Sequence, residues 1–321
     1  MTVLVTGGAG YIGSHVCRLL HERGERVVVV DDLSSGDASR TRARLEVLDL
    51  ASPDATSRLI DIIRFNDVTS AIHLAALKDV GESMDDPERY YRVNLAGLGN
   101  LLAALRATDV RDLVFSSSAA VYGDTQQLVV DERTPCAPAN PYGETKLVGE
   151  WMLAAARRAW GLRAVSLRYF NVAGAGWPDL RDTVAKNLIP IVIDLVRKGA
   201  HPRVFGADHD TDDGTCVRDY VHVLDLAGAH LHALDALGSG TLDVETINIG
   251  TGSGASVLEV IDAVRRVSEQ TVVPEIVAAR AGDPAAVVAD TTLAGDRLGW
   301  TAEFGLDDIV RSAWTESAKG A

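Results

Sequence analysis

The chain has 321 residues, 47% hydrophobic and 24% charged, enough to bury a sizeable core in one large or two modest domains. Its net charge of −14, without any run of Lys and Arg, repels phosphate backbones and argues against a nucleic-acid partner. No window approaches the roughly 20 apolar residues of a membrane span. Three scattered cysteines, Cys17, Cys136 and Cys216, indicate a reducing compartment, so we expect a cytoplasmic protein.

Short apolar runs alternate with amphipathic segments over the first 170 residues. The β-branched run at 27–30 is typical of a strand buried on both faces of a parallel sheet. In chain order, strands are expected at 3–6, 27–30, 45–48, 70–74, 113–116 and 164–168, and helices at 12–22, 55–64, 91–107 and 142–159. This alternation predicts an α/β fold with a Rossmann-type doubly wound parallel sheet.

The rhythm loosens after residue 170, where loops rich in Gly, Asp and Pro occur. A strand at 245–249 and a helix at 256–268 are still expected there. We therefore predict a Rossmann domain over 1–170 and a smaller mixed α/β lobe over 171–321, with some chain crossing back between them.

A glycine-rich turn joins the first expected strand to the first expected helix. Gly7, Gly10 and Gly13 are spaced G-x-x-G-x-x-G, which lets the backbone approach a pyrophosphate at the helix N-terminus. Asp31 ends the second strand, where a carboxylate accepts hydrogen bonds from an adenosine ribose and disfavours a 2′-phosphate. These features favour NAD over NADP. Asp49 follows the third strand, where it could contact the adenine or could act as an ordinary helix cap.

A phenol and an ammonium lie one helical turn apart in PYGETK at 141–146. Tyr142 and Lys146 share a helix face and can point at one substrate. A nearby ammonium favours the phenolate, as does a bound nicotinamide cation. Lowering the phenol pKa from about 10 to near neutrality requires roughly 4 kcal/mol, which a partly desolvated pocket with two cations could supply. The serines at 116–118 end a predicted strand, at the edge where open α/β sheets bind ligands. One of their hydroxyls could share the substrate proton with Tyr142.

Six stretches together resemble the extended short-chain dehydrogenase/reductase superfamily and, within it, the UDP-glucose (UDP-galactose) 4-epimerase family. They are GGAGYIGSHVC at 7–17, HLAALKDVGES at 73–83, FSSSAAVYGD at 115–124, PYGETKLVGE at 141–150, LRYFNVAGA at 167–175 and DGTCVRDYVHVLDLAGAH at 213–230. With weaker similarity between them, they cover nearly the whole chain.

The resemblance assigns roles to individual residues. It implies that Tyr142 is the catalytic base, Lys146 its electrostatic partner and ribose ligand, and Ser118 the proton-sharing hydroxyl. The implied NAD contacts are Gly7, Gly10, Tyr11, Ile12, Gly13, Asp31, Asp49, Leu50, Lys78, Asn94, Ser116, Tyr142, Lys146 and Tyr169. The implied UDP-sugar contacts are Lys78, Ser118, Tyr142, Asn171, Asn187, Leu188, Phe205, Arg218, Tyr220, Arg280, Asp283 and Val287. No metal site is expected, because the histidines show no convincing ligand spacing beyond His230 and His232, which are two apart on a helix and face differently.

The reaction implied by the resemblance is inversion at C4 of a UDP-hexose, UDP-galactose to UDP-glucose, through a 4-keto intermediate. It implies a tightly bound NAD that is regenerated in each turnover. It also implies a homodimer formed through the helices at 91–107 and 142–159.

Three positions depart from the family pattern. Val172 stands where proline is usual, and the segment 176–186 is shorter than in many relatives, with Lys186 where an asparagine is common. Val287 occupies a position that is a bulky tyrosine in some members and a small residue in others. A small residue leaves space for an N-acetyl group, so we expect activity on UDP-N-acetylglucosamine and UDP-N-acetylgalactosamine as well.

Several other functions are weighed against this interpretation. Dehydratases carry Thr-Asp-Glu before Val-Tyr-Gly, whereas this chain has Ser118-Ala119-Ala120, and alanine performs no acid–base chemistry. A 4-epimerase of UDP-pentoses or UDP-uronates remains an alternative. A non-catalytic NAD-sensing protein is a further alternative, which predicts a damaged Tyr/Lys/Ser set, whereas this set is intact.

Overall fold

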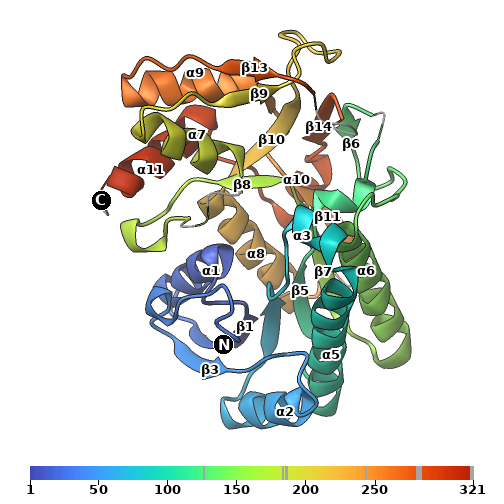
Figure 1. The fold of residues 1–321 in the computed structure, drawn as a ribbon. Coiled ribbons are helices and arrows are strands. Elements are labelled where there is room, and N and C mark those ends of the chain that lie inside the picture. Colours follow the sequence, from blue (N-terminus) through green and yellow to red (C-terminus); the bar gives the residue numbers. More distant parts are fainter. Residues whose placement is uncertain (126, 183, 185–186, 243, 280–283, 319–321) are drawn as a thin grey trace.

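The computed structural model describes residues 1–125, 127–182, 184, 187–242, 244–279 and 284–318. Its largest sheet has seven parallel strands in the order β11-β7-β5-β4-β1-β2-β3 (Figure 1). The strands are β1 (Thr2–Thr6), β2 (Arg26–Asp31), β3 (Arg44–Val47), β4 (Ser70–His73), β5 (Asp112–Ser116), β7 (Arg163–Tyr169) and β11 (Val244–Ile249). This sheet confirms the predicted fold class.

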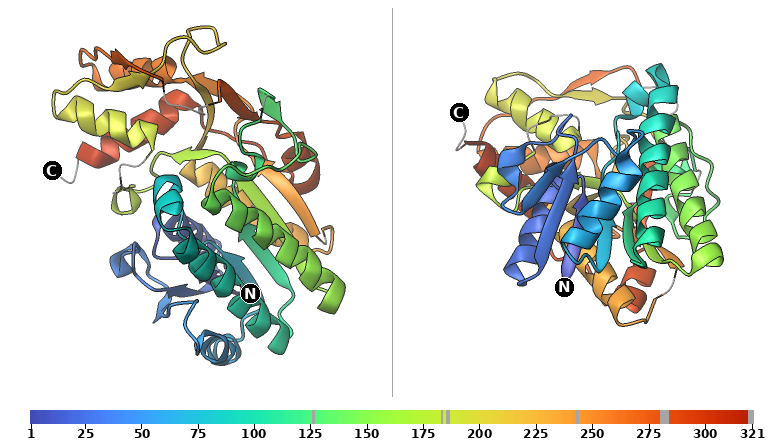
Figure 2. Two further views of the ribbon diagram at one scale, coloured as in Figure 1. Left: turned by 45° about the vertical axis from the view of Figure 1, so that its right-hand side comes forward. Right: turned by 90° about the horizontal axis from the view of Figure 1, so that it is seen from below.

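Helices cover both faces of this sheet, as Figure 2 shows from two further directions. Side chains alternate between the faces along each strand, so Val3 and Val5 join one hydrophobic core while Leu4 joins the other. The first core includes side chains of α1 (Tyr11–Glu22), α8 (Val223–Gly238) and α10 (Thr292–Leu298). The second includes side chains of α2 (Ala55–Phe65), α5 (Gly97–Ala107) and α6 (Pro141–Trp160).

The expected elements of the first 170 residues are present, with ends within one residue of those predicted. The helix expected over 91–107 differs, because it begins as a wider π-helical turn, η2 (Tyr91–Ala96), before α5. Two short helices that the sequence pattern did not reveal, α3 (Val80–Asp85) and α4 (Pro87–Tyr90), precede it. Both begin at an aspartate cap, Asp79 and Asp86.

A smaller lobe lies above the carboxyl edge of the large sheet in Figure 1. Its main sheet has the order β12-β10-β14-β6, with β8 also paired to β10, and a second sheet pairs β13 with β9. The strands are β6 (Val129–Val130), β8 (Asn171–Ala173), β9 (Arg203–Phe205), β10 (Val217–His222), β12 (Gly254–Ser256), β13 (Glu275–Val277) and β14 (Ala286–Ala289). Around them pack α7 (Leu188–Arg197), α9 (Val257–Ser268) and α11 (Leu306–Ala318).

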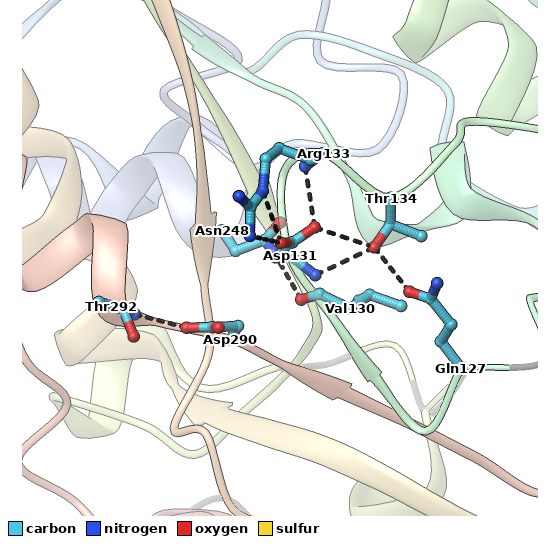
Figure 3. A network of polar contacts seen from close by, with 8 residues as sticks. All are labelled: Gln127, Val130, Asp131, Arg133, Thr134, Asn248, Asp290 and Thr292. Atoms are coloured by element: carbon cyan, nitrogen blue, oxygen red, sulfur yellow. Dashed lines mark hydrogen bonds and ion pairs between the residues drawn. The ribbon is translucent and has the colours of Figure 1, made fainter.

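The two lobes exchange strands. β6 comes from the first half of the chain but pairs with β14, whereas β11 comes from the second half but pairs with β7. Asn248 of β11 joins the sheets, because its Nδ2 donates to the carbonyl of Val130 at 3.0 Å (Figure 3). The turn after β6 is closed by Asp131, which accepts from Arg133, and by Thr134 (Figure 3). A domain division at residue 170 stays a prediction.

Among the residues described, no helix is both long and apolar enough to cross a bilayer.

Candidate active site

The glycine loop forms a tight cradle between β1 and α1. Gly7 has φ +74°, and a Cβ there would lie 2.6 Å from the backbone nitrogen of Ala75. A Cβ on Gly13 would lie 2.1 Å from the carbonyl oxygen of Gly7. Both positions therefore require glycine, and the helix N-terminus that follows at Tyr11 and Ile12 is suited to a pyrophosphate.

Asp31 lies beside this cradle at the carboxyl end of β2. Its Oδ2 accepts from the Ala9 amide at 3.0 Å and its Oδ1 from the Leu33 amide at 2.9 Å. Burial raises the pKa of Asp31, and these two hydrogen bonds oppose the rise. The carboxylate therefore fixes the glycine loop and still has lone pairs available for a ribose.

The third strand leads to the other predicted adenosine contacts. Asp49 is exposed and accepts from the Ala51 amide at 2.8 Å, so it caps the local turn. Leu50 is buried, and its carbonyl accepts from Asn100 Nδ2 at 2.8 Å. Asp49 is therefore not a helix cap, since α2 begins after Asp54, and the adenine contact stays a prediction.

The helix α6 brings Tyr142 and Lys146 to the carboxyl end of β5. Asn140 caps the helix by accepting from the Gly143 amide at 2.9 Å. Lys146 is 4% exposed, and its Nζ donates to the carbonyl of Ser116 at 2.7 Å while lying 5.8 Å from the centre of the Tyr142 ring. Ser118, at the start of η3 (Ala119–Tyr122), forms a hydrogen bond with Tyr142. The structure therefore brings the three predicted catalytic side chains together.

The expected phenolate requires a bound nicotinamide cation as well as Lys146, and the protein groups by themselves do not favour it. Burial raises the pKa of Tyr142, and the hydrogen bond with Ser118 only opposes the rise. Burial also lowers the pKa of Lys146 to about 7, against the charge of Glu150. The protein groups alone therefore do not bring the pKa of Tyr142 near neutrality, because desolvation outweighs the hydrogen bond with Ser118.

Ser116 and Tyr169, both predicted to contact the cofactor, belong to a buried hydrogen-bond chain beneath Lys146. His230 of α8 donates from Nδ1 to the Leu226 carbonyl at 2.8 Å, so its Nε2 accepts from Ser116 Oγ, also at 2.8 Å. Tyr169 hydrogen-bonds to Ser116 as well. Sequence reasoning considered His230 only as a metal ligand and missed this role, since only the fold brings α8 under β5.

Lys78 and Asn94 lie beyond the end of β4. Asn94 Oδ1 accepts from the Leu77 amide at 2.8 Å, and its Nδ2 donates to the Leu77 carbonyl and to Thr145 Oγ1, each at 3.0 Å. Asn94 therefore ties the loop that carries Lys78 to α6, next to the Tyr142 turn.

The predicted UDP-sugar contacts lie on neighbouring strands and loops of the smaller lobe. Asn171 of β8 pairs with Tyr220 of β10, and Arg218 of β10 pairs with Val287 of β14. Arg218 Nη1 donates to the carbonyls of Val217 and Pro284, each at 2.8 Å. Asn187 and Leu188 begin α7, and Phe205 ends β9. Arg280 and Asp283 lie outside the described residues, as does Lys186.

Among the predicted substrate residues that the structure describes, Tyr220 is the most deeply buried. Its side chain is 6% exposed and packs in the core of the smaller lobe with Ile189 and Ile309. It also lines a cavity of about 540 Å³ with Thr251 and Phe304, and no other predicted substrate residue lines that cavity among the described residues.

A buried ion pair behind the site was missed by sequence reasoning. Glu150, one helical turn beyond Lys146 on α6, accepts from Arg168 of β7 at 2.6 and 2.9 Å and from Ser117 Oγ at 2.5 Å. Arg168 also donates to the hydroxyl of Tyr122 at 3.1 Å. The sequence shows only that Glu150 lies on the same helix face as Lys146, at i, i+4, and it does not indicate Arg168 as the partner. The pair fixes the relative positions of α6, β5 and β7.

The buried, hydrogen-bonded His230 leads us to predict that the folded protein loses stability at acidic pH. Burial lowers the pKa of His230 to about 4, against its hydrogen bond to Leu226, whereas an unfolded histidine titrates near 6.5. The unfolded chain therefore binds an extra proton below pH 6.5, and folding stability is lost as pH falls from about 6.5 to about 4.

Between pH 7 and pH 5 this single residue is expected to remove about 2 kcal/mol of stability. The variant His230→Gln keeps an acceptor for Ser116 but has no titrating ring, so its stability should fall by about 2 kcal/mol less over this range. Urea unfolding at both pH values measures the difference, with His21→Gln, which replaces an exposed histidine, as the control. Equal pH dependence of His230→Gln and the unmodified protein would contradict the expectation.

The fold and this site together define a Rossmann-type protein of the short-chain dehydrogenase/reductase class. The sequence profile of the NAD dependent epimerase/dehydratase family matches residues 3–250. The chain belongs to this family, which confirms the resemblance seen in its motifs.

Relatives match over nearly the full length. The UDP-glucose 4-epimerase of Rhizobium leguminosarum bv. trifolii is 42% identical, over 99% of this chain and 98% of the relative. The structure of the Stenotrophomonas maltophila UDP-glucose-4-epimerase, with bound NAD and formylated UDP-arabinopyranose, has a TM-score of 0.94 and 40% identity, covering 99% of this chain and 98% of that chain. The Campylobacter jejuni UDP-Glc/GlcNAc 4-epimerase has a TM-score of 0.86 and 35% identity, covering 99% of each chain.

Proposed function

We propose that the protein is an NAD-dependent UDP-sugar 4-epimerase that interconverts UDP-galactose and UDP-glucose. The observation that carries this proposal is the convergence of Tyr142, Ser118 and Lys146 at the carboxyl end of β5, beside the glycine cradle. The residues fit a dinucleotide, because Gly7 and Gly13 allow a tight loop in which a Cβ would clash with the backbone of Ala75 or of the loop itself, and Asp31 is placed for a ribose. NAD, when bound, would accept a hydride from C4 of the sugar and later return a hydride to the same carbon.

The protein groups move one proton in each direction. Tyr142 takes the proton of the sugar 4-hydroxyl while Ser118 shares it, and Lys146 stabilises the phenolate. Burial raises the pKa of Tyr142, and the hydrogen bond with Ser118 and a cationic nicotinamide, when bound, would both oppose this rise. After the 4-keto sugar has turned its other face to the site, Tyr142 returns the proton and C4 is inverted.

Inversion requires the diphosphate to stay fixed while the sugar turns. Arg218 is suited to this task because its guanidinium is held by two backbone carbonyls of the smaller lobe and remains half-buried beside Val287. The remaining donors of the guanidinium are available to an anion. We propose that the smaller lobe holds the nucleotide and the large sheet performs the chemistry.

A direct test is incubation of the purified protein with UDP-galactose and no added NAD, with the sugars identified by proton NMR. Conversion to UDP-glucose is the expected result, because the cofactor is proposed to remain bound. No conversion, even with NAD supplied, would overturn the proposal and favour a UDP-pentose or UDP-uronate substrate.

The sugar range is proposed to extend to N-acetylated substrates. Val287 pairs with Arg218 on the neighbouring strand and packs against the cluster that contains Tyr122 and Phe170. We propose that a small residue at this position leaves room for an N-acetyl group. We expect conversion of UDP-N-acetylgalactosamine, and we expect Val287→Tyr to abolish it while conversion of UDP-galactose continues. The same NMR assay with both sugars measures this. If the unmodified protein does not convert UDP-N-acetylgalactosamine, the proposed substrate range is wrong.

We further propose a homodimer in the cytoplasm. The helices α5 and α6 lie side by side (Figure 1), and Trp151 on α6 is 61% exposed, which suits a second copy of this face. Sedimentation velocity distinguishes a dimer from the 34.1 kDa monomer. A reducing compartment agrees with three free cysteines, and cell fractionation tests it.

A further inference from the structure

A chain of buried polar contacts begins at the carboxyl end of β5, where the proposed catalytic groups meet. Ser117 is buried between Ser116 and the proposed catalytic Ser118. The carbonyl of Ser116 accepts from Lys146 Nζ at 2.7 Å. The hydroxyl of Ser117 donates to Glu150 Oε1 at 2.5 Å, so this strand end is fixed to α6 through two neighbouring residues.

Arg168 of β7 continues the chain from Glu150 to Tyr122, the last residue of η3. Its guanidinium donates to both carboxylate oxygens of Glu150, at 2.6 and 2.9 Å, and its Nη1 donates to the Tyr122 hydroxyl at 3.1 Å. The guanidinium carbon also lies 5.0 Å from the centre of the Tyr122 ring. Because Tyr122 is only 2% exposed, its hydroxyl depends on partners within the protein.

The Tyr122 hydroxyl uses its own proton to reach the next strand of the large sheet. It donates to Asn248 Oδ1 at 2.6 Å. Asn248 is fully buried on β11, directly opposite Arg168 of β7. A phenol hydroxyl that accepts one hydrogen bond and donates another holds its two partners in a fixed arrangement. Tyr122 therefore joins Asn248 to the ion pair behind the site.

Asn248 joins this chain to the edge strand of the smaller sheet. Its Nδ2 donates to the Val130 carbonyl of β6 at 3.0 Å (Figure 3), and its backbone amide donates to Glu132 Oε1, just beyond β6, at 2.7 Å. Val130 pairs in turn with Ala289 of β14. The side chain and the backbone of Asn248 thus both attach β6 to the large sheet.

From β6 the path to the proposed diphosphate site is short. β14 lies between β6 and β10 in the smaller sheet, and its Val287 pairs with Arg218 of β10. Asp219, the neighbour of Arg218, accepts from the Ala289 amide at 3.2 Å. A displacement of β6 would therefore be passed through β14 to the strand that carries Arg218.

We propose that Tyr122 and Asn248 are positioning residues, which fix the diphosphate site of the smaller lobe relative to the proton-transferring groups on β5 and α6. This inference rests on the proposed function, in which the diphosphate stays in place while the sugar turns. C4 must then reach the same position beside Tyr142 in both orientations of the sugar. A misplacement of about 1 Å, even one caused by a residue far from the chemistry, can cost about 10²-fold in rate.

The test is Tyr122→Phe, which removes the hydroxyl and keeps the ring in its cluster with Val130 and Leu147. Steady-state kinetics with UDP-galactose and excess NAD are measured well below the melting temperature, and UDP affinity is measured by calorimetry. We expect kcat to fall about tenfold to hundredfold while the Kd for UDP is unchanged, because the nucleotide site itself is intact. A kcat within about threefold of the unmodified value, or a UDP affinity that falls in proportion to kcat, would overturn the proposal.

Asn248→Leu breaks the same link from its other side. Leucine is close to asparagine in size but offers neither the acceptor for Tyr122 nor the donor for Val130. It should lower kcat as well, and the double variant with Tyr122→Phe should be no slower than Asn248→Leu alone, because both changes break one link. Losses in kcat that multiply in the double variant would show that the two residues act separately and would overturn the proposal.

The control is Val264→Ala, which removes two methyl groups from the core of the smaller lobe on α9. It should lower the melting temperature and leave kcat unchanged. A loss of kcat equal to that of Tyr122→Phe would show that weakened stability, not positioning, slows the reaction. If the unmodified protein does not convert UDP-galactose, the proposed function itself fails, whereas an unaffected Tyr122→Phe in an active protein overturns this inference alone.

Discussion

Replacing Tyr142 by phenylalanine is expected to lower kcat for UDP-galactose by about 10²–10⁴-fold, the contribution typical of a positioned acid–base group. The ring fills the same space, since only the hydroxyl that bonds to Ser118 is lost. Nucleotide content and melting temperature should therefore stay close to those of the unmodified protein. Steady-state kinetics, with bound NAD quantified in the same preparations, measure the effect.

The matched control is Tyr91→Phe. It also removes a phenol hydroxyl bonded to a residue of α6, Glu144, but Tyr91 is 37% exposed. Activity close to that of the unmodified protein is expected for this control. A Tyr142→Phe variant with a kcat within threefold of the unmodified value would show that another group transfers the proton.

The second large effect is on stability. Replacing Arg168 by methionine leaves Glu150 without its partner in a site where both side chains are less than a tenth exposed. Breaking a buried ion pair by removing one partner typically costs about 3–5 kcal/mol, because an uncompensated charge stays buried. The free energy of unfolding in urea should fall by that amount, and the melting temperature should fall with it.

A control for this prediction exists on the same strand. Arg163 of β7 pairs with Asp112 at 2.6 Å, but its side chain is 39% exposed. Arg163→Met should cost about 1 kcal/mol or less, as is usual for an exposed pair. The double variant Glu150→Leu with Arg168→Leu should be more stable than Arg168→Met, since the carboxylate of Glu150 is removed together with its partner. Equal losses for Arg163→Met and Arg168→Met would contradict the structural argument.

The first half of the fold could be predicted because its signals are local. Val27 to Val30 form a buried strand, the glycines at 7, 10 and 13 mark the first turn, and Tyr142 and Lys146 share a helix face by spacing alone. Each of these features depends on residues that are neighbours in sequence. The resemblance then supplied which serine, Ser118, joins the tyrosine.

The remaining features depend on contacts between residues far apart in sequence. His230 meets Ser116 across 114 positions, and Arg40 meets Arg181 across 141. Neither pairing has a period or spacing that a sequence pattern could reveal. The pairing of β6 with β14 could not be predicted either, because β6 has only two residues and shows no strand pattern. The rise that burial causes in the Tyr142 pKa is a further example, because charge proximity can be inferred from a sequence but the extent of burial cannot.

The central claim is that one hydride leaves C4 and the same hydride returns to it. UDP-galactose carrying deuterium at C4 tests this most directly, with the product UDP-glucose analysed by proton NMR after reaction in ordinary water. The proposed reaction predicts that deuterium stays at C4, because the label remains on a cofactor that never leaves. Replacement of the label by hydrogen from solvent would contradict direct hydride transfer and indicate proton abstraction from carbon instead.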